Sequence, residues 1–171
     1  MIAQKEMSAE EFLAFAEQHP DKRFDFIDGE VVEVSPKPLH GRIQSLFVGA
    51  FLAYNARNPV GVVYTETLHV LSGEKFIPDV CINVASDADY LTTPPRVAVE
   101  IRSDSQSRAS QQRKARAYIQ HGANMVILTF PHEQVEIYLP GHDPLVLTAE
   151  GVIDGGDVLP GFTLPVRDVL G

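Results

Sequence analysis

Two apolar segments on either side of one helix constrain the fold more than any other feature of this sequence. Residues 97–101 (VAVEI) and 125–130 (MVILTF) are almost wholly apolar, as is typical of strands buried on both faces. The stretch from about Ser107 to His121 favours a helix, and Gly122 stands at the usual stop position. A strand, a crossover helix and a second strand indicate a parallel pair. We therefore expect an α/β fold in which a mixed sheet is flanked by α-helices.

The N-terminal part of the sequence predicts a helix and a hairpin. Ser8 and Glu11 have the spacing of a capping box, and the apolar residues after them favour a helix that ends near residue 19. Next, the strand-like segments FDFID and EVVEVS flank Asp28 and Gly29, a dipeptide typical of a two-residue hairpin turn.

The remainder of the chain predicts one long helix and several strands. Apolar residues recur at three- and four-residue spacing from about Leu39 to Arg57, which indicates a helix. The β-rich segments after it are residues 61–71, 75–84, 96–101, 124–130, 134–139 and 144–149. The tail has glycine and proline turn signals and is expected to close over the sheet. A chain of 171 residues has room for one hydrophobic core, so we expect a single domain over residues 1–171.

The charge distribution bears on the partners of the protein. The formal net charge is −9, which argues against a surface that binds nucleic acid everywhere. However, six of the 14 basic residues lie between residues 96 and 116, where only two acidic residues oppose them, so that stretch carries +4. A local basic patch can steer a polyanion to one face of an acidic protein. The alternative interpretation is a solvated helix face.

The cysteine content and hydropathy indicate the compartment. The single cysteine, Cys81, excludes an internal disulfide and a cysteine zinc cluster. No apolar run has the length of a membrane span or the pattern of a signal peptide. We therefore expect a cytoplasmic protein without membrane contact.

Two carboxylates stand where apolar strands meet loops. Asp79 follows Pro78, whose missing N–H is typical of a strand edge or bulge. Along the segment RVAVEIR, Val97 and Val99 share one face, whereas Glu100 lies on the other, at the C-terminal end of the strand. Ligands of open α/β sheets bind beyond this end. Two such carboxylates suit Mg²⁺, although a solvent-facing position at a strand end is the alternative for Asp79.

A set of motifs occurs in a defined order along nearly the whole chain. The set comprises FDFIDGEVVEVSP, PLHGRI, FIPDVCI, VAVEIRS, the spacing from Lys114 to Tyr118, and LPGFTL. In this order the motifs resemble a large bacterial family of restriction-endonuclease-like proteins within the PD-(D/E)xK nuclease superfamily. The resemblance implies a restriction-endonuclease-like fold, a divalent metal cofactor (Mg²⁺ or Mn²⁺) and hydrolysis of phosphodiester bonds.

The resemblance also implies roles for individual residues. Asp79 and Glu100 match the metal-binding carboxylates of the superfamily. Lys114 matches the catalytic lysine, which in this family has moved from a position two residues after the glutamate onto the following helix. Arg102 stands at that usual lysine position, and because a guanidinium does not deprotonate, we expect it to hold a phosphate. Tyr118 lies one helical turn after Lys114 and should share its face.

Further positions common in the family have two interpretations each. Glu30, after the hairpin turn, is either an additional metal ligand or part of the hairpin structure, and the second is favoured. His40 precedes the long helix, where a lone histidine is more often a cap or a packing residue than a catalyst. Arg108, Arg113 and Arg116 are the expected nucleic-acid-binding residues of the basic helix.

The leading functional hypothesis is a metal-dependent endonuclease acting on DNA. A metal held by Asp79 and Glu100 would activate water, and Lys114 would orient that water or neutralise the charge on the phosphate. The alternative is a catalytically weak or inactive nuclease-fold domain that binds DNA or a protein, which the acidic charge and departures from the family at Ser110 and Met125 favour. A third hypothesis is a hydrolase of small phosphate esters. Double-strand cleavage by one site per chain would favour a homodimer.

Overall fold

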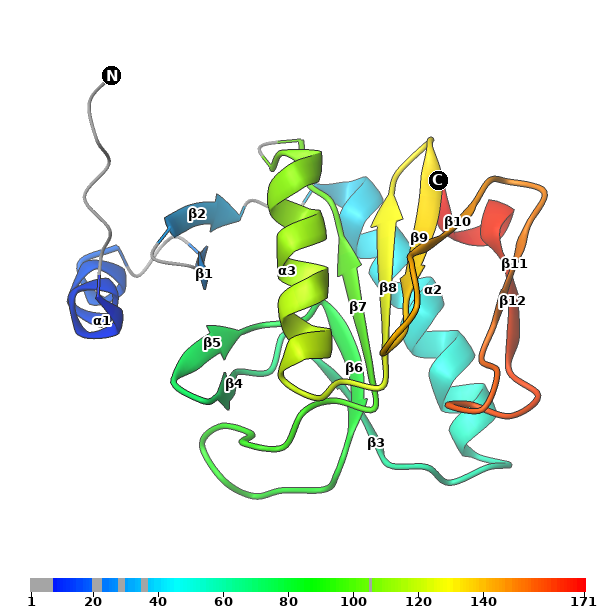
Figure 1. The fold of residues 1–171 in the computed structure, drawn as a ribbon, viewed down its shortest axis with the longest axis horizontal. Coiled ribbons are helices and arrows are strands. Elements are labelled where there is room, and N and C mark those ends of the chain that lie inside the picture. Colours follow the sequence, from blue (N-terminus) through cyan, green and yellow to red (C-terminus); the bar gives the residue numbers. More distant parts are fainter. Residues whose placement is uncertain (1–7, 20–22, 28–29, 35–36, 105) are drawn as a thin grey trace.

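The computed structural model describes residues 8–19, 23–27, 30–34, 37–104 and 106–171 (Figure 1). The helices in these residues are α1 (Ala9–Glu17), α2 (Pro38–Asn55), α3 (Arg108–Gln120) and the 3₁₀ helix η1 (Val166–Val169). The strands are β1 (Arg23–Ile27), β2 (Glu30–Val34), β3 (Val62–Thr65), β4 (His69–Leu71), β5 (Glu74–Phe76), β6 (Val80–Asn83), β7 (Val97–Ile101), β8 (Met125–Phe130), β9 (Gln134–Tyr138), β10 (Leu145–Leu147), β11 (Val152–Asp154) and β12 (Thr163–Pro165).

The largest sheet is mixed and has six strands in the order β10-β9-β8-β7-β6-β3. Its two central strands, β7 and β8, are parallel in the register Val97↔Met125, and the other neighbours are antiparallel. Every residue of β7 and β8 is buried, as their apolar sequences predict. Helix α3 connects these two strands, which confirms the strand–helix–strand unit expected from the sequence.

Helices α2 and α3 cover opposite faces of the six-stranded sheet (Figure 1). On the α2 face, Phe47 belongs to one hydrophobic core with Val97 and Val99. The tail closes this same face through buried residues of β11, β12 and η1, as expected. On the α3 face, Tyr118 packs in a second core with Ala98. The alternation of β7 side chains between the two faces therefore follows the sequence prediction.

A four-stranded sheet in the order β2-β1-β5-β4 forms a smaller unit together with α1 (Figure 1). Strands β1 and β2 pair antiparallel, which confirms the hairpin, whereas its turn residues Asp28 and Gly29 lie outside the described residues. The ring of Phe12 on α1 stacks on Phe26 of β1, with 4.9 Å between the ring centroids. This aromatic contact attaches α1 to the small sheet.

The helix ends follow the local signals in the sequence. Ser8 and Glu11 form the predicted capping box at the start of α1. Ser107 caps α3 by accepting a hydrogen bond from the backbone N–H of Ser110. Gly122, with a φ of 100°, follows α3 in the left-handed region, where glycine lacks the steric penalty of a Cβ. Among the residues that the structure describes, no helix is long and apolar enough to cross a bilayer.

Two of the β-rich segments differ from the sequence prediction, because each breaks into two strands of different sheets. Residues 61–71 form β3 and β4, and residues 75–84 form β5 and β6. At the first break Glu66 has a φ of 51°. At the second, Pro78 has no N–H for a ladder, while its carbonyl accepts a hydrogen bond of 3.1 Å from the Glu66 backbone N–H. The chain thus passes from the small sheet to the large one immediately before Asp79.

Candidate active site

Asp79 is held in place by strand β7 and by helix α2. Its backbone N–H donates to the Val99 carbonyl at 3.0 Å. Its side-chain Oδ2 accepts a hydrogen bond of 2.7 Å from the backbone N–H of Ile101, and Oδ1 lies 3.0 Å from Nε2 of His40. The residue is only 9% exposed. These contacts fix the carboxylate at the junction of β6 and β7, and a solvent-facing position is thereby excluded.

Glu100 lies at the same end of the β6–β7 pair as Asp79. The strands are antiparallel in the register Val80↔Val99, so Asp79, which precedes Val80, and Glu100, which follows Val99, lie at the same end. The carboxylate of Glu100 accepts hydrogen bonds from Nζ of Lys114 on Oε2 and from the hydroxyl of Tyr118 on Oε1, both at 2.8 Å. Glu100 is 3% exposed, so its charge is balanced by these partners rather than by water.

Lys114 and Tyr118 reach Glu100 from one face of α3. They stand four residues apart, a spacing that places side chains on one side of a helix, as expected from the sequence. Lys114 is 2% exposed and Tyr118 is fully buried. The aromatic ring of Tyr118 also packs against Phe76 of β5, with 4.6 Å between ring centroids. The side chain of Lys114 therefore lies in the protein interior, on a helix that packs against both sheets.

His40 contacts Asp79 and does not cap α2. The N-cap position of α2 is Lys37, and no side chain caps this helix end. His40 lies one turn further on, is 5% exposed, and directs Nε2 toward the Asp79 carboxylate. The sequence placed His40 near the helix start but gave no sign of its partner.

The other expected site residues lie further out. Arg102 follows β7, pairs with Glu133 at 3.3 Å, and lines a separate hollow together with His40 and His132. Glu30 begins β2, and its side chain lies outside the described residues. The proposed roles of Arg102 and Glu30 therefore stay predictions.

The basic residues of α3 are less available than their sequence clustering indicates. Arg108 forms ion pairs with Glu133 and with the buried Glu136, and its guanidinium lies 3.9 Å from the ring centroid of Phe130. Arg116 is exposed beside the ring of Tyr138, and Arg113 is also exposed. Glutamates of the neighbouring sheet thus neutralise part of the basic stretch.

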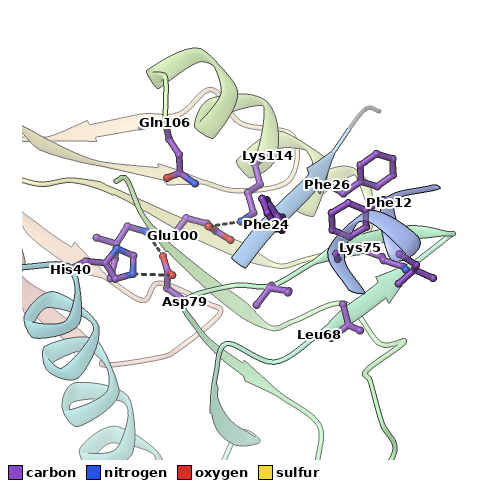
Figure 2. Close-up of a pocket in the computed structure, with 14 residues that line it drawn as sticks. Phe12, Phe24, Phe26, His40, Leu68, Lys75, Asp79, Glu100, Gln106 and Lys114 are labelled. Atoms are coloured by element: carbon purple, nitrogen blue, oxygen red, sulfur yellow. Dashed lines mark hydrogen bonds and ion pairs between the residues drawn. The ribbon is translucent and has the colours of Figure 1, made fainter. Parts of the chain in front are cut away.

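One cavity joins Asp79, Glu100 and Lys114 to an apolar wall (Figure 2). Its volume is about 280 Å³. The polar end also includes His40 and Gln106. The opposite end is lined by residues of α1, of β1 and of the segments next to β4 and β5: Phe12, Leu13, Phe24, Phe26, Leu68 and Ile77. The large sheet with its helices and the small sheet with α1 therefore form the two sides of one site.

The apolar side of this cavity was not predicted from the sequence. The aromatic residues Phe12, Phe24 and Phe26 have the pattern of an ordinary hydrophobic face of a helix or strand. Their position opposite Glu100 results from packing between segments about 75 to 90 residues apart in the chain, and no local motif carries that information. The only available signal was the density of phenylalanines in the N-terminal segment.

The donor atoms fit a hard divalent cation bound with several waters. Mg²⁺ and Mn²⁺ accept one or two protein carboxylates and complete their shell with water, which matches Asp79 and Glu100 facing one cavity. In the described part of the chain, no group of three or more His, Cys, Asp or Glu residues could hold a metal ion, so a fully protein-built zinc site is not found there. An ion bound here would share the carboxylate oxygens with Lys114, Tyr118 and His40.

Cys81 is chemically inert at this site. Burial, followed by the negative charge of Glu100, raises the pKa of its thiol to about 12. At neutral pH the sulfur therefore stays protonated and is a weak nucleophile. The side chain is fully buried, as is typical of a small core residue.

Comparisons with known proteins agree with this fold. The family model Uma2, described as "Putative restriction endonuclease", matches residues 9–167. The solved structure of a protein described as a putative nuclease, from Anabaena variabilis, superposes with a TM-score of 0.82 at 20% identity. The superposition covers 96% of this chain and 97% of that chain. No curated protein matches the sequence.

Proposed function

Since the chain belongs to the Uma2 family of putative restriction endonucleases, we propose that it is a metal-dependent nuclease that hydrolyses phosphodiester bonds in DNA. The observation that carries this proposal is the convergence of Asp79, Glu100 and Lys114 on one cavity. A carboxylate pair with an adjacent ammonium is suited to binding a cation, a water and a phosphate together. The description of the structural neighbour as a nuclease is consistent with this reading.

In this mechanism Asp79 and Glu100 would hold the divalent ion, Mg²⁺ or Mn²⁺. When bound, such an ion lowers the pKa of a coordinated water and offsets the charge that builds on the phosphate. The Ile101 N–H and His40 keep the Asp79 oxygens oriented, and Tyr118 does the same for Glu100. Fixed ligands of this kind reduce the reorganisation needed during the reaction.

Lys114 has two tasks in the proposed reaction. In the structure its ammonium balances Glu100. With substrate and metal present, the same group donates a hydrogen bond to the attacking water or to a phosphate oxygen, where it stabilises the developing negative charge. Double-strand cleavage by one such site per chain would favour two copies acting together, so we also propose a two-fold dimer as the cutting species for duplex DNA.

Glu100→Gln provides the test, because it removes the charge of a metal ligand and keeps its shape. We expect plasmid nicking in Mg²⁺ or Mn²⁺ to fall by about two orders of magnitude or more, since second-sphere changes alone cost 10–100-fold at metal sites. Glu136→Gln is the matched control: it is an equally buried glutamate outside the cavity, and its variant should still cut.

The alternative function is an inactive nuclease-fold module that binds DNA or a protein. The observation that favours it is the pairing of Glu100 with Lys114, which balances the proposed metal ligand within the chain. Wild-type protein that binds DNA but never cuts it, over a range of metals and substrates, would decide for this alternative. Cleavage of a small chromogenic phosphodiester without DNA cleavage would favour a hydrolase of small esters.

A further inference from the structure

The apolar end of the active-site cavity is built from aromatic rings. Phe12, Phe24 and Phe26 line it together with Leu68 and Ile77. The whole cavity, polar end included, has a volume of about 280 Å³, just below the roughly 300–1,000 Å³ common for small-ligand pockets. A cavity of this size has room for one planar ring system, whereas a peptide segment or a nucleic-acid duplex is too large for it.

The rings line the same cavity as the candidate catalytic groups. Figure 2 shows Phe24 between Lys114 and the stacked pair Phe12–Phe26. Phe24 and Phe26 are only half-buried, so their rings retain surface that faces the cavity. Any phosphate placed at Glu100 would thus have an aromatic surface next to it.

Cations around the site contribute little additional binding for a phosphate backbone. Arg102 and Arg108 both pair with Glu133. Lys37 pairs with Asp104. Nucleic-acid affinity normally comes from Lys and Arg neutralising phosphates, and these three cations are already balanced by carboxylates, whereas Lys75 lies in the lining of the cavity itself. Base stacking on the aromatic side chains is a second source of affinity that the cavity offers beside Lys75.

We propose that the aromatic end of the cavity seats an unpaired nucleobase, so that the chain cuts nucleic acid at or beside a single-stranded nucleotide. A base inside a duplex is stacked on both faces and cannot reach a pocket beside its own phosphate unless it is extruded. A base that is already unpaired does not bear that cost. This inference rests on the proposed nuclease function and adds the substrate class.

The experiment compares three DNA substrates of one sequence: single-stranded, fully paired, and paired except for one bulged nucleotide that carries 2-aminopurine. Cleavage is measured in Mn²⁺ with wild-type protein. Emission of 2-aminopurine, which reports stacking, is measured with the Glu100→Gln variant, in which cleavage is expected to be lost. The test variant is Phe24→Leu, which keeps an apolar side chain and removes the ring. The control is Tyr90→Leu, since Tyr90 is exposed and lies outside this cavity.

We expect the bulged and single-stranded substrates to be cut faster than the paired duplex. Phe24→Leu should reduce this preference by roughly tenfold and abolish the emission change, because stacking of one base on one aromatic ring contributes about that factor. Tyr90→Leu should leave both unchanged. Thermal melts of the variants check that each is folded.

The outcomes separate this inference from the proposed function. Equal cleavage of paired and unpaired substrates, with Phe24→Leu like wild type, overturns the inference and leaves the nuclease function standing. If no substrate is cut but Phe24→Leu abolishes the emission change, the nuclease function is overturned. The binding of an unpaired nucleobase at the aromatic end of the cavity is then supported. No emission change with any substrate overturns the inference, whether or not the protein binds or cuts.

Discussion

The pair formed by Glu100 and Lys114 has an energetic consequence that follows from its burial. Both side chains are 3–4% exposed, and the hydroxyl of Tyr118 donates a hydrogen bond to the other oxygen of the carboxylate. A buried pair contributes little net stability compared with apolar residues, but removal of one partner leaves an uncompensated charge. The presence of this ion pair in the core is therefore better explained by a role in the chemistry of the site than by a contribution to stability.

Lys114→Met tests this consequence at the residue scale. The substitution should lower the free energy of unfolding by about 3–5 kcal/mol, because Glu100 is left buried without its cation. The double variant with Glu100→Gln should regain part of that loss, which denaturant melts of both variants would measure.

The same variant also reports on the metal. Without the Lys114 ammonium, the negative charge of Asp79 and Glu100 is less compensated, so a bound divalent ion should stabilise the folded protein more. Millimolar Mn²⁺ should therefore raise the Tm of Lys114→Met more than that of wild type. Asp79→Ala added to Lys114→Met is the control and should remove the gain. An equal gain with and without Asp79 would place the ion elsewhere on this acidic protein.

At the scale of elements, α1 is the helix that carries Phe12 to the cavity and depends on its cap. The Ser8–Glu11 box satisfies N–H groups at its first turn, and one face of α1 packs on β1 through Phe12 and Phe26. A helix of nine residues is too short to persist without such contacts. The position of Phe12 in the cavity lining therefore depends on both the Ser8–Glu11 capping box and the stacking of Phe12 on Phe26.

Ser8→Ala is expected to loosen α1 without unfolding the sheets. Loss of an N-cap side chain costs about 1 kcal/mol, and here that cost falls on one peripheral helix. Amide hydrogen exchange should become faster in α1 and stay unchanged in β7 and β8. Faster exchange throughout the protein would show instead that α1 belongs to the same cooperative unit as the large sheet.

Local sequence signals predicted the centre of the large sheet and the start of α1. The strands β7 and β8 with α3 between them, the side of β7 on which Glu100 lies, and the capping box of α1 all depend on residues close together in the chain. Pro78 indicated a strand edge or bulge, but neither the break near Glu66 nor the change of sheet at Pro78 was predicted, because each depends on which sheet the two halves join. The contact of His40 with Asp79 was missed for a similar reason: the two residues are brought together only by the packing of α2 on the sheet.

At the scale of the whole molecule, the net charge of −9 and the paired cations limit how the protein can attract DNA. Proteins that contact 6–10 phosphates lose about 10³–10⁵ in affinity between 50 and 200 mM salt. Because Arg102, Arg108 and Lys114 are already paired with glutamates, few phosphate contacts form at the site, and this protein should lose only about tenfold over that range for a single-stranded substrate. Fluorescence anisotropy titrations at the two salt concentrations would measure this. A loss of a thousandfold or more would point to a phosphate-binding surface instead.

The break at Pro78 separates two tasks along the chain. Asp79, Glu100 and Lys114 belong to the large sheet and its helix, whereas Phe12, Phe24 and Phe26 belong to the small sheet and α1. Substitutions in the small unit can alter the shape of the substrate seat while every proposed metal ligand stays in place. A library of variants confined to α1 and β1 should therefore yield enzymes with altered substrate choice and unaltered metal requirement, so the N-terminal unit is the place to begin re-engineering selectivity.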